Sequence, residues 1–154
     1  MGGQFLLPSF LRRGLALPLS LGLVLAVTAA NSTETMKIER VTSPGGIEAW
    51  LVESHANPLI AMRFAFRGGA SQDPAGKEGL SYFVSGMMDE GAGDLDSVAF
   101  QERLQTLAMR LDFDASRDVM LGNVQTLSAN RDEAFDLLRL ALTSPRFDDD
   151  ATTR

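Results

Sequence analysis

A run of seven residues in the second half of the chain constrains its fold most strongly. From Met109 to Ala115, apolar and polar side chains alternate without exception. Alternate residues of a β-strand point to opposite faces, so this run predicts a strand with one buried and one solvated face. A turn at Ser116–Asp118 leads into a second apolar run that ends near Leu127. The two runs together predict an antiparallel hairpin.

Two earlier segments show the same period of two. Ile47–Glu53 alternates, and Ile60–Phe66 places its apolar side chains on one face and Arg63 on the other. The turn residues His55–Pro58 separate the two runs. Because strands joined by a short turn usually pair with each other, we expect these two segments to form a second antiparallel hairpin.

Three segments have the 3.6-residue period of a helix. A helix is expected over Glu78–Asp89. Its apolar stripe comprises Leu80, Phe83, Val84, Met87 and Met88. This spacing indicates that Met87 and Met88 belong to the core, although a Met-rich surface can also bind peptides. A second helix is expected to begin at Asp96 or Ser97, both good N-cap residues, and to bury Phe100, Leu104 and Leu107.

The third helix is expected to start at Asn130. Asn130 and Glu133 have the spacing of a capping box, and Pro145 should end the helix. Its predicted apolar face comprises Ala134, Phe135, Leu138, Ala141 and Leu142. Asp148–Asp150 has the acidic character of a further helix start, which is favoured over a cation site. The whole order predicts an α+β fold, an antiparallel sheet built from hairpins with helices packed on one face.

The N-terminal residues 1–30 have the features of an export signal. Arg12 and Arg13 precede the apolar segment Gly14–Val27, and small residues follow as far as Ala30. At 14 residues the apolar segment is short for a membrane span, so we expect a cleaved signal peptide, periplasmic localisation and no stable membrane span. An uncleaved anchor is the alternative. Residues 31–37 are predicted to be a polar linker before a folded part at residues 38–154.

Composition excludes several classes of function. The net charge is −6, which argues against a nucleic-acid partner because such proteins need a basic face. The chain has no Cys, which excludes disulfides and thiolate metal sites. His55 is the single His, and its place in a turn favours a surface residue over a metal ligand. Asp112 and Asp114 share a strand face, but two carboxylates alone make a poor Ca²⁺ site.

The segment Arg67–Met88 carries a family resemblance. It contains Asp73-Pro74-Ala75-Gly76-Lys77-Glu78-Gly79-Leu80 and then Ser81-Tyr82-Phe83-Val84-Ser85-Gly86-Met87-Met88. This resembles the opening of the pitrilysin (insulinase, M16) metallopeptidase family, in which D-P-x-G-x-x-G-L precedes a helix with H-x-x-E-H-M. The similarity continues through the later elements to Ser144-Pro145-Arg146-Phe147. It therefore covers most of residues 38–154.

The resemblance implies that the catalytic residues have been lost. In the family motif, two His residues four apart hold Zn²⁺, and the Glu between them is the general base on a zinc-bound water. Tyr82, Ser85 and Gly86 stand at those three positions. Their side chains supply no such ligand set, so we expect no catalytic, cofactor-binding or metal-binding residue here. These positions either form a substrate-contact face or have no remaining role. The family's third ligand, a Glu, would lie downstream of Arg154.

The resemblance also implies a role. Family members often work as pairs of similar halves, one with zinc and one without, which together enclose unfolded peptides. We therefore expect a non-catalytic subunit whose partner is a homologous H-x-x-E-H peptidase that holds the zinc. One alternative is an active zinc peptidase whose site is completed outside this fragment, and another is a stand-alone envelope binding protein. The residues after Phe147 predict a C-terminally truncated chain that holds the N-terminal portion of one family domain.

Overall fold

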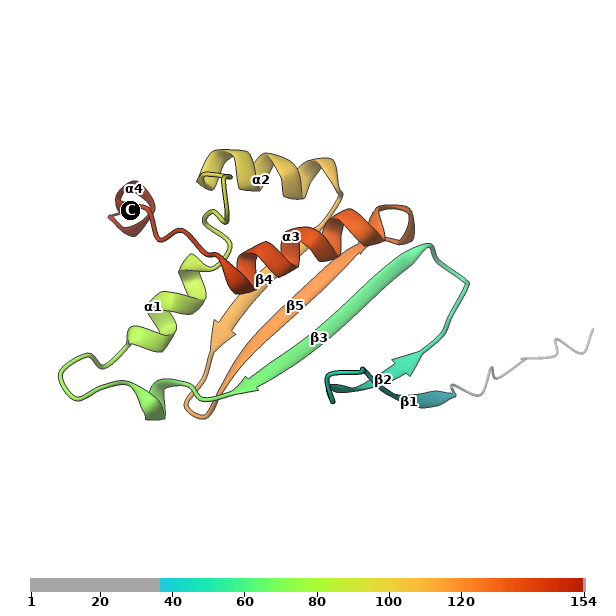
Figure 1. Ribbon diagram of the computed structural model, residues 1–154, viewed down its shortest axis with the longest axis horizontal. Coiled ribbons are helices and arrows are strands. Elements are labelled where there is room, and N and C mark those ends of the chain that lie inside the picture. Colours follow the sequence, from blue (N-terminus) through green and yellow to red (C-terminus); the bar gives the residue numbers. More distant parts are fainter. Residues whose placement is uncertain (1–36, 154) are drawn as a thin grey trace, which may run out of the picture. The chain divides into compact units, whose positions relative to one another are not determined.

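The computed structural model describes residues 37–153 (Figure 1). The predicted signal peptide at residues 1–30 lies outside the described residues, as does the predicted linker at residues 31–37 apart from Lys37. Within these residues, five strands, four α-helices and two short 3-10 helices follow one another. They are β1 (Ile38–Thr42), β2 (Glu48–Val52), β3 (Leu59–Arg67), a 3-10 turn (Ala70–Gln72), α1 (Leu80–Met87), α2 (Ser97–Thr106), β4 (Arg110–Ala115), β5 (Val119–Leu127), a second 3-10 turn (Ser128–Asn130), α3 (Arg131–Thr143) and α4 (Asp149–Thr152).

The strands form two antiparallel sheets. One has three strands in the order β3-β5-β4, and the other is the hairpin β1–β2. The predicted hairpin of β4 and β5 is confirmed, with Phe113 opposite Gly122 at its centre. The α+β class is also confirmed, since antiparallel strands combine with helices throughout the described part.

The predicted pairing of Ile47–Glu53 with Ile60–Phe66 is wrong. Strand β2 pairs with β1, which the sequence analysis did not identify, and β3 pairs along all nine of its residues with β5. The turn between β1 and β2 explains this choice. Ser43 donates its N–H to the carbonyl of Ile47 at 2.8 Å, and its hydroxyl oxygen accepts from the N–H of Ile47 at 3.0 Å. This short turn closes β1 onto β2 at little entropic cost.

The core lies between the three-stranded sheet and the helices α2 and α3. Phe100 is fully buried in α2, and Leu111 and Val124 face it from β4 and β5. Helix α3 contributes Ala134, Leu137, Leu138 and Ala141. The prediction included Phe135, which is 37% exposed, and missed Leu137, which is 3% exposed. The buried residues follow the spacing i, i+3, i+4, i+7, which leaves Phe135 at the border of the buried face.

A glycine in β5 leaves room for two aromatic rings. Gly122 lies opposite Phe64 of β3 and Phe113 of β4, and the two ring centroids are 6.2 Å apart in an edge-to-face arrangement. A Cβ at Gly122 would lie 2.2 Å from Cζ of Phe64. The ring of Phe64 therefore occupies the space that any side chain at position 122 would need, and it covers backbone that a glycine leaves bare.

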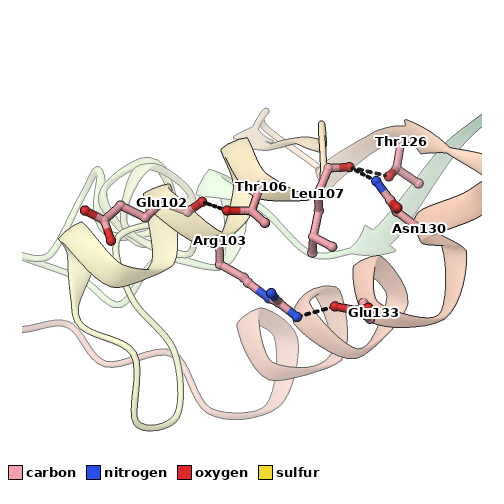
Figure 2. Close-up of polar contacts among 7 residues, drawn as sticks. All are labelled: Glu102, Arg103, Thr106, Leu107, Thr126, Asn130 and Glu133. Atoms are coloured by element: carbon pink, nitrogen blue, oxygen red, sulfur yellow. Dashed lines mark hydrogen bonds and ion pairs between the residues drawn. The ribbon is translucent and has the colours of Figure 1, made fainter.

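The end of α2 is tied to β5 and to the start of α3 (Figure 2). The carbonyl of Leu107 accepts hydrogen bonds from Thr126 Oγ1 at 3.2 Å and from Asn130 Nδ2 at 2.9 Å. The predicted capping box at Asn130 is therefore wrong, since its side chain makes no cap hydrogen bond to α3. Glu133 instead forms an ion pair with Arg103 of α2. Free carbonyls at a helix end need donors, and here two side chains distant in sequence supply them.

The other helix predictions are largely confirmed. Helix α2 starts at Ser97, and the carboxylate of Asp96 accepts from the N–H of Ala99 at 2.8 Å, as an N-cap does. Helix α4 follows Asp148, as the acidic residues predicted. Within residues 37–153, no helix combines the length and the apolar character that crossing a bilayer requires.

Candidate functional site

The segment before α1 is folded around one carboxylate. Oδ2 of Asp73 accepts from the N–H of Gly79 at 2.8 Å, and Oδ1 accepts from the N–H and hydroxyl of Ser81 at 3.0 and 2.6 Å. Gly79 is the N-cap of α1 and adopts φ 94°. Because it is a glycine, it has no side-chain oxygen that could cap the helix. Asp73 therefore supplies from six residues upstream the acceptor that an N-cap side chain normally provides.

The same contacts set the charge of this carboxylate. The hydrogen bond from the Ser81 hydroxyl, joined by those from backbone N–H groups, holds the pKa of Asp73 below its ordinary value of 3.8. Glu78 closes the loop, because its Oε1 accepts from the N–H of Gly76 at 3.0 Å. The Asp-Pro-Ala-Gly-Lys-Glu-Gly-Leu segment thus has a structural role, which is to start α1, and this role needs no metal.

Helix α1 carries the three positions that the sequence analysis singled out. Tyr82 is 52% exposed, Ser85 is 4% exposed, and Gly86 is exposed. The Ser85 hydroxyl donates to the carbonyl of Tyr82 within the helix at 2.8 Å. A Cβ at Gly86 would meet no atom within 4 Å. Of the three positions, Tyr82 and Gly86 are thus exposed, whereas Ser85 is buried and its hydroxyl is bonded to the helix backbone.

The apolar stripe of α1 is covered over only part of its length. Met87 and Met88 are buried, as their spacing predicted. Leu80 and Phe83, on the first turn, are 40% and 49% exposed. The helix therefore packs against the molecule mainly through its C-terminal half, and its N-terminal half presents an apolar and aromatic surface that includes Tyr82.

The chemistry of the three side chains at these positions does not fit a zinc ion. A phenol, a hydroxyl bonded to the helix backbone and a glycine provide no imidazole and no carboxylate. Residues 37–153 also contain no group of three or more His, Cys, Asp or Glu side chains placed to hold a metal ion. His55 is exposed in the loop between β2 and β3, as its turn position predicted.

The carboxylates of Asp112 and Asp114 on β4 differ in their surroundings from the carboxylate of Asp89, which follows α1. Asp112 and Asp114 are both exposed on β4, and Asp112 accepts from Nδ2 of Asn123 at 2.6 Å. Asp89, which the sequence analysis did not single out, is partly buried beyond the end of α1. Burial raises its pKa above 3.8, and the charges of Glu90 and Asp112 add to that effect. No periodicity marks such a residue, because its burial depends on tertiary packing.

Comparison with known proteins agrees with this architecture. The family model described as Insulinase (Peptidase family M16) matches residues 50–154. A Helicobacter pylori protein named non-peptidase homolog YmxG is 31% identical over 99 residues, which cover 64% of this chain and 23% of that protein. The chain thus spans about a quarter of the length of that relative.

Solved structures share the fold. The crystal structure of a peptidase M16 inactive domain from Pseudomonas fluorescens matches with a TM-score of 0.69 at 24% identity, over 75% of this chain and 28% of that one. A protease from Helicobacter pylori gives 0.62 at 19%, over 75% and 28%. Pitrilysin gives 0.63 at 16%, over 77% and 13%. Because the family model covers more than half of its residues, the chain belongs to the insulinase family of peptidases, family M16.

Proposed function

We propose that this protein is a non-catalytic subunit of a zinc-peptidase heterodimer, and that it helps to bind and enclose peptides. The observation that carries the proposal is the contrast within residues 73–86. The loop that starts α1 is fully bonded around Asp73, while Tyr82, Ser85 and Gly86 replace the family's zinc ligands and base. The scaffold of the motif is present without its chemistry.

Two relatives support the non-catalytic part of the proposal. One is named a non-peptidase homolog, and another is described as an inactive M16 domain. The partner follows from the family's use of paired halves, in which a homologous H-x-x-E-H chain would hold the zinc. The apolar first turns of α1, with Leu80, Tyr82 and Phe83 exposed, provide a surface suited to contact with an unfolded peptide. The apolar segment after Arg12 and Arg13 supports export to the periplasm.

The decisive experiment is an affinity pull-down of the tagged full-length protein from its own envelope extract. We expect near one-to-one recovery of a protein that carries H-x-x-E-H, identified by mass spectrometry. The purified protein alone should hold no zinc and cleave no peptide, whereas the mixture should cleave. Chelator-sensitive hydrolysis by the pure protein, with about one zinc per chain, would refute the non-catalytic assignment. Recovery of the bait alone would refute the partnership.

A triple variant provides an internal control. Tyr82→His, Ser85→Glu and Gly86→His together restore the family motif on α1. We expect no peptidase activity, because the third ligand and the groups that orient the ligands would still be missing. Position 85 is also buried, so a Glu there would need room that the Ser occupies. Measurable hydrolysis by the triple variant would show that α1 alone determines activity.

A further inference from the structure

The face of the three-stranded sheet that carries the polar side chains of the alternating strands has an open hollow of about 370 Å³. Side chains from all three strands line it. They include Ala61 and Arg63 of β3, Asn123 and Gln125 of β5, and Arg110 and Asp112 of β4. None of them belongs to the positions of the family motif on α1, so this surface is separate from the site described above.

Strand register brings these residues together. Arg63 lies opposite Asn123, which lies opposite Asp112, and in the next row Ala61 lies opposite Gln125, which lies opposite Arg110. The two arginines therefore stand diagonally on either side of β5, roughly 12 Å apart at their Cα atoms from ordinary strand spacings. Asn123 and Gln125 of β5 lie between them, and the small side chain of Ala61 occupies the corner beside Arg63.

The two arginines differ from most others in the described part of the chain. Five arginines there form ion pairs with carboxylates, namely Arg40, Arg103, Arg131, Arg139 and Arg146. Arg63 and Arg110 are exposed and make no hydrogen bond or ion pair within residues 37–153. They stay unpaired in a chain of net charge −6, although Asp112 lines the same hollow. Asp112 instead accepts from Asn123 at 2.6 Å.

We infer that this hollow binds a carboxylate side chain from an acidic segment of a partner protein. A guanidinium pairs with a carboxylate through two parallel N–H···O bonds, and two guanidiniums on either side of one strand present such donors from both sides. The amide of Gln125 adds a neutral donor. Arg63, Arg110 and Asp112 together give the hollow a net charge of about +1, which one singly charged carboxylate balances and a doubly charged phosphate exceeds. The inference does not depend on the proposed peptidase partnership.

The test uses two fluorescein-labelled peptides of equal length, a Gly-Glu repeat and a Gly-Gln repeat, titrated with the full-length protein and followed by fluorescence anisotropy. We expect the Gly-Glu peptide to bind at least about tenfold more tightly, and its affinity to fall with added salt. Arg63→Gln and Arg110→Gln should each weaken it about tenfold. Arg117→Gln, in the β4–β5 turn outside the hollow, should leave it unchanged.

Three results would overturn the inference. They are equal affinity for the two peptides, no binding by a protein whose thermal melt shows it folded, and an equal loss of affinity in Arg117→Gln and Arg63→Gln. A thermal melt of each variant separates loss of binding from loss of folding, which exposed side chains should not cause. Tighter binding of a phosphoserine-containing repeat than of the Gly-Glu repeat would also contradict the assignment to a carboxylate.

Discussion

The two antiparallel hairpins of this protein have similar sequence patterns and opposite surroundings. In β4–β5, Leu111 and Val124 are 6% and 3% exposed and share the core with residues of α2 and α3. In β1–β2, Trp50 is 80% exposed and Leu51 and Val52 are 40% and 41% exposed. Alternation therefore reports that a segment can pair as a strand, but burial depends on which other elements reach it. An isolated two-stranded hairpin is marginally stable in water, so β1–β2 contributes less to stability than β4–β5.

The comparison is tested most strongly by removing one large aromatic side chain from each region. Phe100→Ala, in the core above β4–β5, should lower the free energy of unfolding by about 3–5 kcal/mol, because the side chain is fully buried. Trp50→Ala, in β2, should change it by less than about 0.5 kcal/mol. Urea denaturation followed by circular dichroism measures both. Similar losses in the two variants would show that the β1–β2 hairpin is part of the core.

Two glycines sharpen the same comparison. Gly122→Ala should cost about 1–3 kcal/mol, because the new Cβ would overlap the ring of Phe64. Gly45→Ala, in the β1–β2 turn, is the matched control, since its Cβ would meet only Ser43 Oγ, at 3.9 Å. Its effect should stay within about 0.5 kcal/mol. Thermal melts compare the melting temperatures of the two variants. An unchanged melting temperature for Gly122→Ala would mean that the ring of Phe64 moves aside at no cost.

The link between α2 and α3 can be tested at Asn130. Asn130→Asp keeps the oxygen that an N-cap needs but loses the Nδ2 donor to the Leu107 carbonyl. We expect a loss of about 1–2 kcal/mol. Asn57→Asp in the exposed loop before β3 should be nearly neutral. Denaturant unfolding compares the two variants, and a stabilised Asn130→Asp protein would restore the capping-box interpretation that the structure rejects.

The smallest expected effects concern how the stability of the protein depends on pH through Asp73 and Asp89, the two carboxylates that flank α1. Asp73 has a lowered pKa when folded, so its contribution to stability is present above the unfolded value and is lost as pH falls below about 3.8. Asp89 has a raised pKa, so its contribution is present at low pH and is lost as pH rises through its folded value.

Asp73→Asn should therefore flatten the acid side of a plot of melting temperature against pH. Asp89→Asn should raise the melting temperature near neutral pH, because no buried charge remains to be desolvated. Both profiles come from calorimetry between about pH 3 and pH 7, a range that spans the ordinary carboxyl values. Two variants that shift the profile in the same direction would contradict the opposite surroundings of these carboxylates.

Local patterns were sufficient for some elements. The hairpin β4–β5 and the start of α2 at Asp96 follow from residues within a few positions of one another. The partner of β3 could not be predicted in this way, because β5 lies about sixty residues later and pairs with it through tertiary packing. Asn130 was misassigned for the same reason, since its acceptor is a carbonyl 23 residues away.

The candidate site likewise has features that the sequence predicts and features that only the structure shows. The family resemblance predicts from the sequence that Tyr82, Ser85 and Gly86 stand at the positions of the zinc ligands and base, but the burial of Ser85 is visible only in the structure. Arg63 and Arg110 are 47 residues apart, and no pattern connects them until β5 lies between β3 and β4. Sequence periodicity assigns a residue to a face, whereas strand order decides which residues share it.

The hydrogen bonds of Asp73 have a consequence for how such a chain can change over generations. The acceptors at the start of α1 are the carboxylate of Asp73 and the carbonyl of Lys77, both upstream of the helix, and none belongs to positions 82, 85 or 86. Substitutions at those three positions therefore do not touch the groups that start the helix. The residues at positions 82, 85 and 86 can therefore change while the groups that start the helix, and with them the local fold, stay the same.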